Sequence, residues 1–462
     1  MSNKIYDFIV VGSGSGGGSL AYYLNKSGAK VLLLEAGKFY RKNTFPKTEA
    51  ETSANLYWGG GIEFGKDGKM GFLRTRLVGG SSIVYQCLMD RFDDNAFDAW
   101  KDESGVDWFS NATMDAHYNQ IERDMQLHTF TASERNRNAN LFTEACDKLG
   151  YKWSDLRRGQ SDCAHDRGND CIGCLGGCFR DSKQSSLVAF VQKAEKEGLE
   201  IITDTEIHKV EPNSNTCKIH GIQNGQKVSF EGTKVILSGG AFGTTRMMSM
   251  SGFKSKLPAL GKKFASHPQF MWLGFQNEPV DAHKLAFQTV ASKDPNFRKE
   301  GFKLENVFAP PISIGMLMNV TGKKHQDYMK KYRYMQCIEV AVRDENVGEI
   351  QCDNNGKLTI IKPLTDQDKT RRDKGLAAIK NILQTAGANE VFESNFYFGL
   401  HLMGGCVMGT DSDKSVVNPE FNVHGEKTLY IADSSIYPNA PGINPGLTIK
   451  ALSHRLSTQL LK

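Results

Sequence analysis

Short apolar runs alternate with glycine-rich turns over the first forty residues of the chain. Asp7–Val11 and Val31–Leu34 are apolar runs of strand length, and Ser19–Lys26 between them has a helical pattern. Gly12–Gly18 supplies a tight turn between the first strand and the helix. This order predicts a strand–helix–strand unit at the N-terminus.

The pattern changes further along the chain. Residues 93–150 predict a mainly helical stretch, and a polar loop that holds several cysteines follows at 157–182. From about 270 to 365, the alternation of strands and helices gives way to short strands, prolines and charged loops, which predicts a separate antiparallel sheet. We also expect helices at 185–197, Asp366–Ala386 and Leu447–Leu461, and strands at Glu200–Thr203 and Val235–Leu237.

Composition and charge narrow the class of protein. Hydrophobic residues make up 39% of the 462 positions and charged residues 24%, as in ordinary soluble globular proteins. The net charge of +5 is too small over this length to indicate by itself a nucleic-acid partner or a membrane surface. The N-terminus has neither a basic start nor a small-residue cleavage site, and no apolar run approaches the ~20 residues that a membrane helix needs. We therefore expect a cytoplasmic protein.

The turn after the first strand carries a dinucleotide-binding pattern. Gly12, Gly14 and Gly17 form the spacing G-x-G-x-x-G. The first glycine makes the turn, the second lets the backbone approach a pyrophosphate, and the third packs the helix on the strand. Glu35 ends the second strand 18 residues past Gly17, where a carboxylate can bind ribose hydroxyls. These residues predict a dinucleotide site and leave FAD and NAD as alternatives.

Further motifs follow in order along the chain, and they distinguish between FAD and NAD as the cofactor. They resemble the signatures of the glucose–methanol–choline (GMC) family of FAD-dependent oxidoreductases, and they are nearest to its cholesterol oxidase-like and cysteine-loop dehydrogenase branch. The match covers both ends and the middle of the chain. The blocks are Arg76–Ser82, Asp98–Trp100, Trp108–Ser110, Tyr118–Glu122, Gly239–Gly252, Leu260–Pro268, His401–Gly409, Leu429–Ser435 and Asn444–Thr448.

The resemblance implies an α/β fold. It consists of a Rossmann-like FAD-binding domain of the glutathione-reductase type and an α+β substrate domain with an antiparallel sheet. The change of rhythm in the hydrophobic pattern assigns residues 1–92, 183–270 and 399–462 to the FAD-binding domain. Residues 93–182 and 271–398 are then the substrate-binding domain, which carries the cysteine-bearing loop. The chain is short for the family, which implies a trimmed substrate domain.

The resemblance also implies which residues contact the flavin. Two positions depart from the family pattern. Tyr85 stands where the family usually carries asparagine, and Phe72 stands where members with covalent flavin carry a histidine. We therefore expect FAD to be bound non-covalently. Besides the three glycines and Glu35, the implied cofactor-binding residues are Gly80, Ser81, Ser82, Val210, Asp433, Asn444 and Pro445.

His401 and Asn444 are the expected catalytic pair. In related enzymes, a histidine occupies the position of His401, and a histidine or asparagine that of Asn444. Oxidation of an alcohol by hydride transfer requires removal of the hydroxyl proton, and a neutral imidazole can accept it. An amide cannot, so Asn444 is expected to orient the substrate oxygen. The competing interpretation of His401 is an ordinary loop histidine between glycines.

The cysteine-bearing loop has two interpretations. Cys171, Cys174 and Cys178 lie close together in sequence, with Cys163 upstream. Thiolates at such short spacing can ligate an iron–sulfur cluster or zinc, and some dehydrogenase relatives hold a cluster in this region. The spacing differs from that of ferredoxins and no proline follows the last cysteine, so we expect a loop without metal.

These residues predict FAD-dependent oxidation of a small-molecule alcohol to a carbonyl, with His401 as the base. Oxygen, a quinone or a redox protein could accept the electrons, and the substrate could be a hydrophobic alcohol, a sterol or a sugar. The alternatives are a lyase-like flavoprotein, an iron–sulfur-containing sugar or alcohol dehydrogenase subunit, and an NAD-dependent enzyme. Lys323–Tyr334 interleaves lysines with tyrosines, which predicts a solvated helix face or a docking surface for a membrane or an electron acceptor.

Overall fold

The N-terminal segment folds as the strand–helix–strand unit that its pattern predicts. The computed structural model of the chain describes residues 4–164 and 170–462. In it, β1 (Ile5–Val11) pairs in parallel with β2 (Val31–Leu34), and α1 (Gly17–Lys26) connects the two. All four residues of β2 are buried, because helices and loops cover both faces of the sheet.

The first sheet has seven strands in the order β8-β2-β1-β11-β10-β9, with β20 beside β11. β8, β2, β1, β11 and β20 are parallel, whereas β9 and β10 extend the sheet as antiparallel strands. The carboxyl ends of the parallel strands therefore meet at one edge, which is where such sheets bind ligands. The remaining bounds are β8 (Glu200–Ile202), β9 (Thr205–Pro212), β10 (Cys217–Gln223), β11 (Gln226–Leu237) and β20 (Leu429–Ile431).

The second sheet has nine strands and is mainly antiparallel, as the middle of the chain predicts. Its order is β3-β4-β19-β12-β15-β14-β13-β6, with β18 beside β12. Two of its strands, β3 and β4, come from residues 1–92, so this segment contributes to both sheets. The bounds are β3 (Glu63–Phe64), β4 (Met70–Phe72), β6 (Trp153–Asp155), β12 (Pro268–Phe275), β13 (Val290–Ser292), β14 (Phe302–Asn306), β15 (Met335–Val342), β18 (Glu390–Phe392) and β19 (Tyr397–Gly399).

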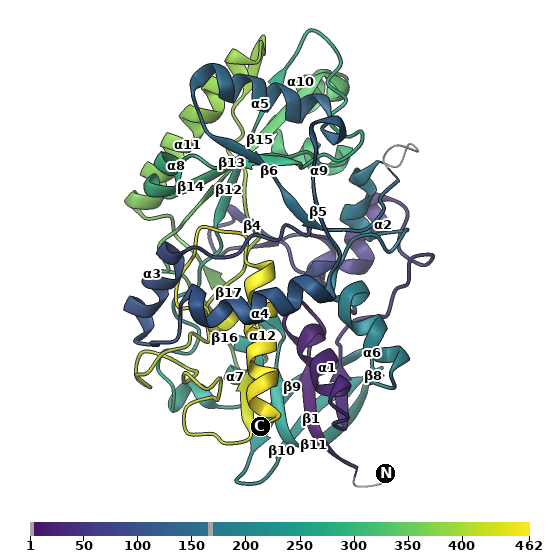
Figure 1. The fold of residues 1–462 in the computed structure, drawn as a ribbon, viewed down its shortest axis with the longest axis vertical. Coiled ribbons are helices and arrows are strands. Elements are labelled where there is room, and N and C mark those ends of the chain that lie inside the picture. The colour runs from purple at the N-terminus through teal and green to yellow at the C-terminus, as the bar shows by residue number, and fades with distance from the viewer. Residues whose placement is uncertain (1–3, 165–169) are drawn as a thin grey trace.

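Helices cover both sheets (Figure 1). α12 (Gly446–Leu460) packs on α1 and α4, and α11 (Asp366–Thr385) packs on the second sheet. The helix expected at 185–197 is instead a π-helical turn at Leu187–Val191 joined to α6 (Gln192–Lys196). The other bounds are α2 (Glu49–Leu56), α3 (Asp94–Ser104), α4 (Asn111–Asp124), α5 (Arg137–Leu149), α7 (Gly240–Met250), α8 (Pro295–Glu300), α9 (Pro311–Leu317) and α10 (Gly322–Met329).

Two further antiparallel sheets have two strands each. They pair β5 (Leu127–Thr129) with β7 (Arg157–Gly159) and β16 (Glu349–Cys352) with β17 (Leu358–Ile361). Within the described ranges, no helix combines the length and the apolar character that crossing a bilayer requires. The division of the chain into two discontinuous domains stays a prediction, but the two sheets provide one scaffold for each.

Candidate functional site

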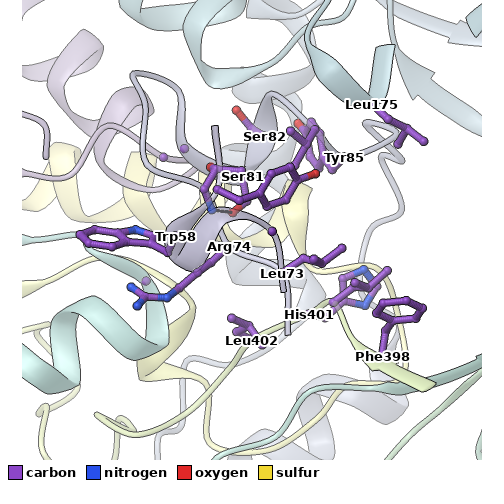
Figure 2. A pocket seen from close by; sticks show the side chains of 18 of the residues that line it. Trp58, Leu73, Arg74, Ser81, Ser82, Tyr85, Leu175, Phe398, His401 and Leu402 are labelled. Carbon is purple, nitrogen blue, oxygen red and sulfur yellow. Dashed lines mark hydrogen bonds between the residues drawn. The ribbon is translucent and has the colours of Figure 1, made fainter. Parts of the chain in front are cut away.

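A cavity of about 980 Å³ lies between the two sheets. The carboxyl end of β1, the Gly80–Ser82 loop, the inner face of the second sheet and the start of α12 all line it. Figure 2 shows Ser81, Ser82 and Tyr85 on one part of its wall and His401 beside Phe398 on another. The cavity thus brings together the predicted dinucleotide motif and the predicted catalytic pair, which lie far apart in the sequence.

The glycine turn leaves room for a pyrophosphate. A Cβ on Gly12 would lie 2.4 Å from the carbonyl oxygen of Ser238, and one on Gly17 would lie 1.9 Å from that of Gly12, so both glycines serve close packing. A Cβ on Gly14 would meet nothing within 4 Å, because this residue faces the open cavity. No side chain caps the N-terminus of α1. The N-terminal end of the helix is therefore open to an anion seated over Gly14.

Glu35 lies at the end of β2, as predicted, and is buried. Its carboxylate accepts hydrogen bonds from the backbone N–H (3.1 Å) and hydroxyl (2.6 Å) of Ser13 and from the N–H of Gly37 (3.0 Å). Burial nevertheless raises its pKa, which shows that these donors do not fully replace water. Ribose hydroxyls would supply further donors, so the residue fits the role expected of it.

Most of the other predicted cofactor residues line the same cavity. Gly80, Ser81, Ser82, Asp433, Asn444 and Pro445 all do so. The Asp433 carboxylate accepts from Gly240 N–H (2.8 Å) and the Thr244 hydroxyl (2.6 Å), which ties β20 to the start of α7.

Val210 does not line the cavity. It is buried in β9, where its N–H donates to the Ser251 hydroxyl at 2.9 Å, and Thr205–Ile207 of the same strand form the wall instead. The two positions that depart from the family pattern differ in setting. Tyr85 lies on the wall and accepts a hydrogen bond from Lys450 Nζ at 3.1 Å, whereas Phe72 packs against Phe242 and Phe264.

His401 is paired with a second histidine that the sequence analysis did not single out. The Nδ1 atoms of His401 and His267 lie 3.1 Å apart, with the rings nearly perpendicular. Gly442 N–H donates to His267 Nε2 at 2.9 Å, so this nitrogen must be unprotonated. His267 therefore carries its proton on Nδ1 and donates it to His401. In a neutral His401 the remaining proton lies on Nε2, which makes no hydrogen bond to the described residues.

A buried ion pair holds His267 in place. His267 has a positive φ of 44°, a conformation that costs a non-glycine residue roughly 1–3 kcal/mol. The Asp344 carboxylate accepts from the backbone N–H groups of Ser266 (3.2 Å) and His267 (3.1 Å). Lys362 Nζ lies 2.9 Å from the same carboxylate, and neither of the two charged side chains is exposed. Strain of this kind persists only where the surrounding structure enforces it.

Asn444 has a fixed orientation as well. Its Oδ1 accepts from Lys303 Nζ at 2.9 Å, so its Nδ2 hydrogens are the groups left for the cavity. Lys303 also binds Asp90 (3.0 Å) and Glu305 (2.6 Å). Burial opposes the positive charge of Lys303, but the two carboxylates outweigh it and raise its pKa. Burial and the nearby Lys303 together lower the pKa of His401 to about 4, which keeps the imidazole neutral at physiological pH.

Two carboxyl groups form part of the cavity wall. Glu305 of β14 and Glu339 of β15 are directly opposite in the sheet, and both are buried. Burial and the neighbouring Glu305 raise the pKa of Glu339 well above its usual value. The sheet thus disfavours the charged form of Glu339, while the Glu305 carboxylate lies 2.6 Å from Lys303 Nζ.

The cysteine-bearing loop borders the cavity through Gly173, Leu175 and Gly176. Hydrogen bonding from Cys174 and the backbone N–H of Lys183 lower the pKa of the Cys178 thiol to about 5. The side chain of Cys171 lies outside the described part of the structure. Among the described residues, no three histidine, cysteine or acidic side chains are grouped as a metal site would require. The expectation that the loop is free of metal stays a prediction.

The residues that sequence reasoning missed are His267, Lys303, Glu305 and Glu339. His267 stood in a recognised block but had no assigned role. The run Phe302–Asn306 places Lys303 and Glu305 two residues apart, and a strand puts such residues on one face. Two charged residues on one face of a buried strand are therefore the signal that could have found them.

Comparison with known proteins establishes the family. The N- and C-terminal models of the GMC oxidoreductases match residues 53–269 and 353–453, well over half of the chain. The chain therefore belongs to the GMC oxidoreductases, which are FAD-binding flavoproteins. This confirms the predicted family, the cofactor and the fold of a Rossmann-type FAD-binding domain with a substrate domain.

Individual relatives align along almost the whole chain. Long-chain-alcohol oxidase FAO4B of Arabidopsis thaliana is 24% identical, and the match covers 98% of this chain and 67% of that protein. Cholesterol oxidase of Acinetobacter baumannii is 22% identical, with 98% and 94% covered. The crystal structure of pyridoxine 4-oxidase from Mesorbium loti has a TM-score of 0.78 at 16% identity, with 98% and 99% covered. A formate oxidase variant from Aspergillus oryzae has a TM-score of 0.74 at 15% identity, with 100% and 98% covered.

Substitutions in the glycine turn should separate cofactor binding from folding. We expect Gly14→Val to fold but to lose FAD, because its side chain would occupy the open space in which the pyrophosphate fits. Gly17→Val should fail to fold, because its Cβ would collide with the Gly12 carbonyl. Circular dichroism and the FAD absorbance of the purified proteins measure both effects. A yellow, folded Gly14→Val protein would contradict the assignment.

The lowered pKa of His401 predicts a pH-dependent stability. Between pH 6.5 and about 4 the unfolded chain protonates this histidine and the folded chain does not, so the stabilisation is complete above pH 6.5 and is lost as the pH falls. The full contribution is about 3 kcal/mol. When the pH is lowered from 7 to 5, the melting temperature of His401→Gln should therefore fall less than that of the wild type. Equal losses in thermal melts would show that His401 titrates normally.

Proposed function

We propose that this protein oxidises the CH–OH group of an alcohol to a carbonyl, and that His401 and Asn444 hold the reacting oxygen. The observation that carries the proposal is their convergence on one cavity with the dinucleotide motif. The names of relatives such as long-chain-alcohol oxidase and cholesterol oxidase support an alcohol as substrate and oxygen as electron acceptor. Bound non-covalently over Gly14, FAD would supply the acceptor for the hydride that leaves the carbinol carbon.

Both members of the pair can donate to the substrate oxygen. His401 offers Nε2–H because its Nδ1 accepts from His267, and Asn444 offers Nδ2–H because its Oδ1 accepts from Lys303. Fixed donors of this kind stabilise an oxygen on which negative charge develops. Since His267 is buried and Lys303 is held by two carboxylates, the donors need no reorientation when the alcohol binds.

The hydroxyl proton requires an acceptor. The sequence predicts His401 for this role. In the structure, however, Nδ1 of His401 accepts a hydrogen bond from His267, so Nε2 already carries a proton and would have to release it first. The Glu305–Glu339 pair lines the same cavity, and a positioned carboxylate can accept a proton. We therefore propose the carboxyl pair as the acceptor, with proton acceptance by His401 as the alternative.

Matched variants of His401 distinguish the two roles. Glutamine can donate a hydrogen bond from nearly the same place as Nε2 but cannot accept a proton. We therefore expect His401→Gln to remain within about tenfold of the wild-type rate, and His401→Ala to lose ~10²–10³-fold. Glu305→Gln should lose ~10²–10⁴-fold, because it removes the carboxylate of the pair that can accept a proton.

The measurement is anaerobic stopped-flow bleaching of the flavin by a short soluble alcohol, with the FAD spectrum as the control for folding. If His401→Gln and His401→Ala are equally slow while Glu305→Gln is unimpaired, His401 is the base. Absence of bleaching by any alcohol in the wild type would overturn the proposed function itself and favour a lyase-like flavoprotein.

A further inference from the structure

The cavity changes from polar to apolar along the inner face of the second sheet. Gln269, Ala341 and Lys303 are register neighbours on β12, β15 and β14, and this row lies beside Asn444 through its bond to Lys303. The next row is Met271, Glu339 and Glu305. Because side chains two apart along a strand share a face, the third row is Leu273, Cys337 and Val307. The members of these rows that line the cavity are Gln269, Met271, Glu305, Glu339, Cys337 and Val307. The rows thus become apolar with distance from the reacting end.

The apolar end continues to the surface. After Val307 the chain runs along the cavity through Phe308 and enters α9, whose residues Ile312 and Met316 also line the cavity. Ile312 is 53% exposed, Met316 42% and Phe179, which lines the cavity from the cysteine-bearing loop, 44%. These three side chains form what we call the apolar rim. They belong to the cavity wall and to the outer surface at the same time.

Neighbouring elements hold the backbone of the rim in place. The Glu49 carboxylate of α2 accepts from the N–H groups of Ile312 (2.8 Å) and Ser313 (2.7 Å), and so fixes the start of α9. His325 of α10 lies 3.1 Å, from Nε2 to oxygen, from the Gly315 carbonyl. Figure 1 shows α2, α9 and α10 on one side of the molecule. Large apolar side chains presented on a supported surface mark an interaction site.

Positive charge accompanies the rim. Lys47, which precedes α2, is exposed and lies on the cavity wall, and Lys323 and Lys324 are exposed on α10. Lys323 is partly neutralised by Asp327 at 3.0 Å. Lysines beside exposed apolar side chains suit a lipid surface that contains anionic headgroups.

We propose that the apolar rim docks on a lipid surface, and that the substrate is an apolar alcohol that enters the cavity from that surface. This inference rests on the proposed function. A protein seated on the rim would close the entrance, because the rim residues are themselves part of the cavity wall. A lipid surface would instead deliver the substrate through it. The polar end of the cavity at Gln269 and Asn444 then receives the hydroxyl group, and Cys337, Val307 and the rim contact the tail.

Co-sedimentation of the FAD-loaded protein with vesicles tests the docking. With phosphatidylcholine vesicles containing a quarter phosphatidylglycerol, we expect the wild type to bind and Ile312→Asp/Met316→Asp to bind at least about tenfold more weakly. The matched control is Ile222→Asp, which changes a 46% exposed isoleucine on β10, away from the rim. Circular dichroism and FAD absorbance verify that each variant is folded.

The outcomes separate this inference from the proposed function. If the wild type bleaches with a short soluble alcohol but does not bind vesicles, the lipid docking is wrong and the function stands. If Ile312→Asp/Met316→Asp and Ile222→Asp weaken vesicle binding equally, the rim is not the docking surface. Self-association of the wild type that Ile312→Asp/Met316→Asp abolishes would assign the rim to a second copy of the chain and overturn the inference.

Discussion

The ion pair between Asp344 and Lys362 is the interaction on which the chemistry of the cavity depends. Removing both charges from water costs several kcal/mol per ion, and their attraction repays this only when the remaining hydrogen-bonding capacity is satisfied. Here the carboxylate also accepts two backbone N–H groups, which hold His267 at positive φ. His267 in turn determines which nitrogen of His401 carries the proton. A charge pair remote from the substrate thereby sets the hydrogen-bonding character of the site.

Lys303 fixes the orientation of Asn444, as His267 fixes the protonated nitrogen of His401. It is the one residue among these that contacts both the amide and a member of the carboxyl pair. Its charge also disfavours protonation of His401, so orientation and electrostatics come from the same side chain. Because Asp90 and Glu305 both bind it, the lysine is fixed in position and its charge is compensated without a bound substrate. The site is therefore organised before the alcohol arrives, which is what electrostatic stabilisation of a reacting oxygen requires.

The features that the sequence predicts correctly are those determined by residues close together in the chain. The strand–turn–helix around Gly12–Gly17 and the position of Glu35 follow from periodicity and from the space that a glycine leaves, and the structure has both. The contact between His267 and His401 arises instead from the pairing of β12 with β19, in which Pro268 lies opposite Gly399. Nothing in either segment specifies that partner. Val210 shows the same limit, because the point at which β9 reaches the cavity depends on the packing of the whole sheet.

The inner face of the second sheet shows why a buried carboxyl pair is tolerated. Successive inward positions of β14 are Lys303 and Glu305, and Val307 follows the strand, while Leu304 packs in the core. The alternation of the strand lets charged residues face the cavity without entering the core. Placing Glu339 opposite Glu305 still raises the free energy of the folded state, because burial and the neighbouring carboxyl group both disfavour the charged form of Glu339. Such a cost is typical of functional sites, where activity is retained at the expense of stability.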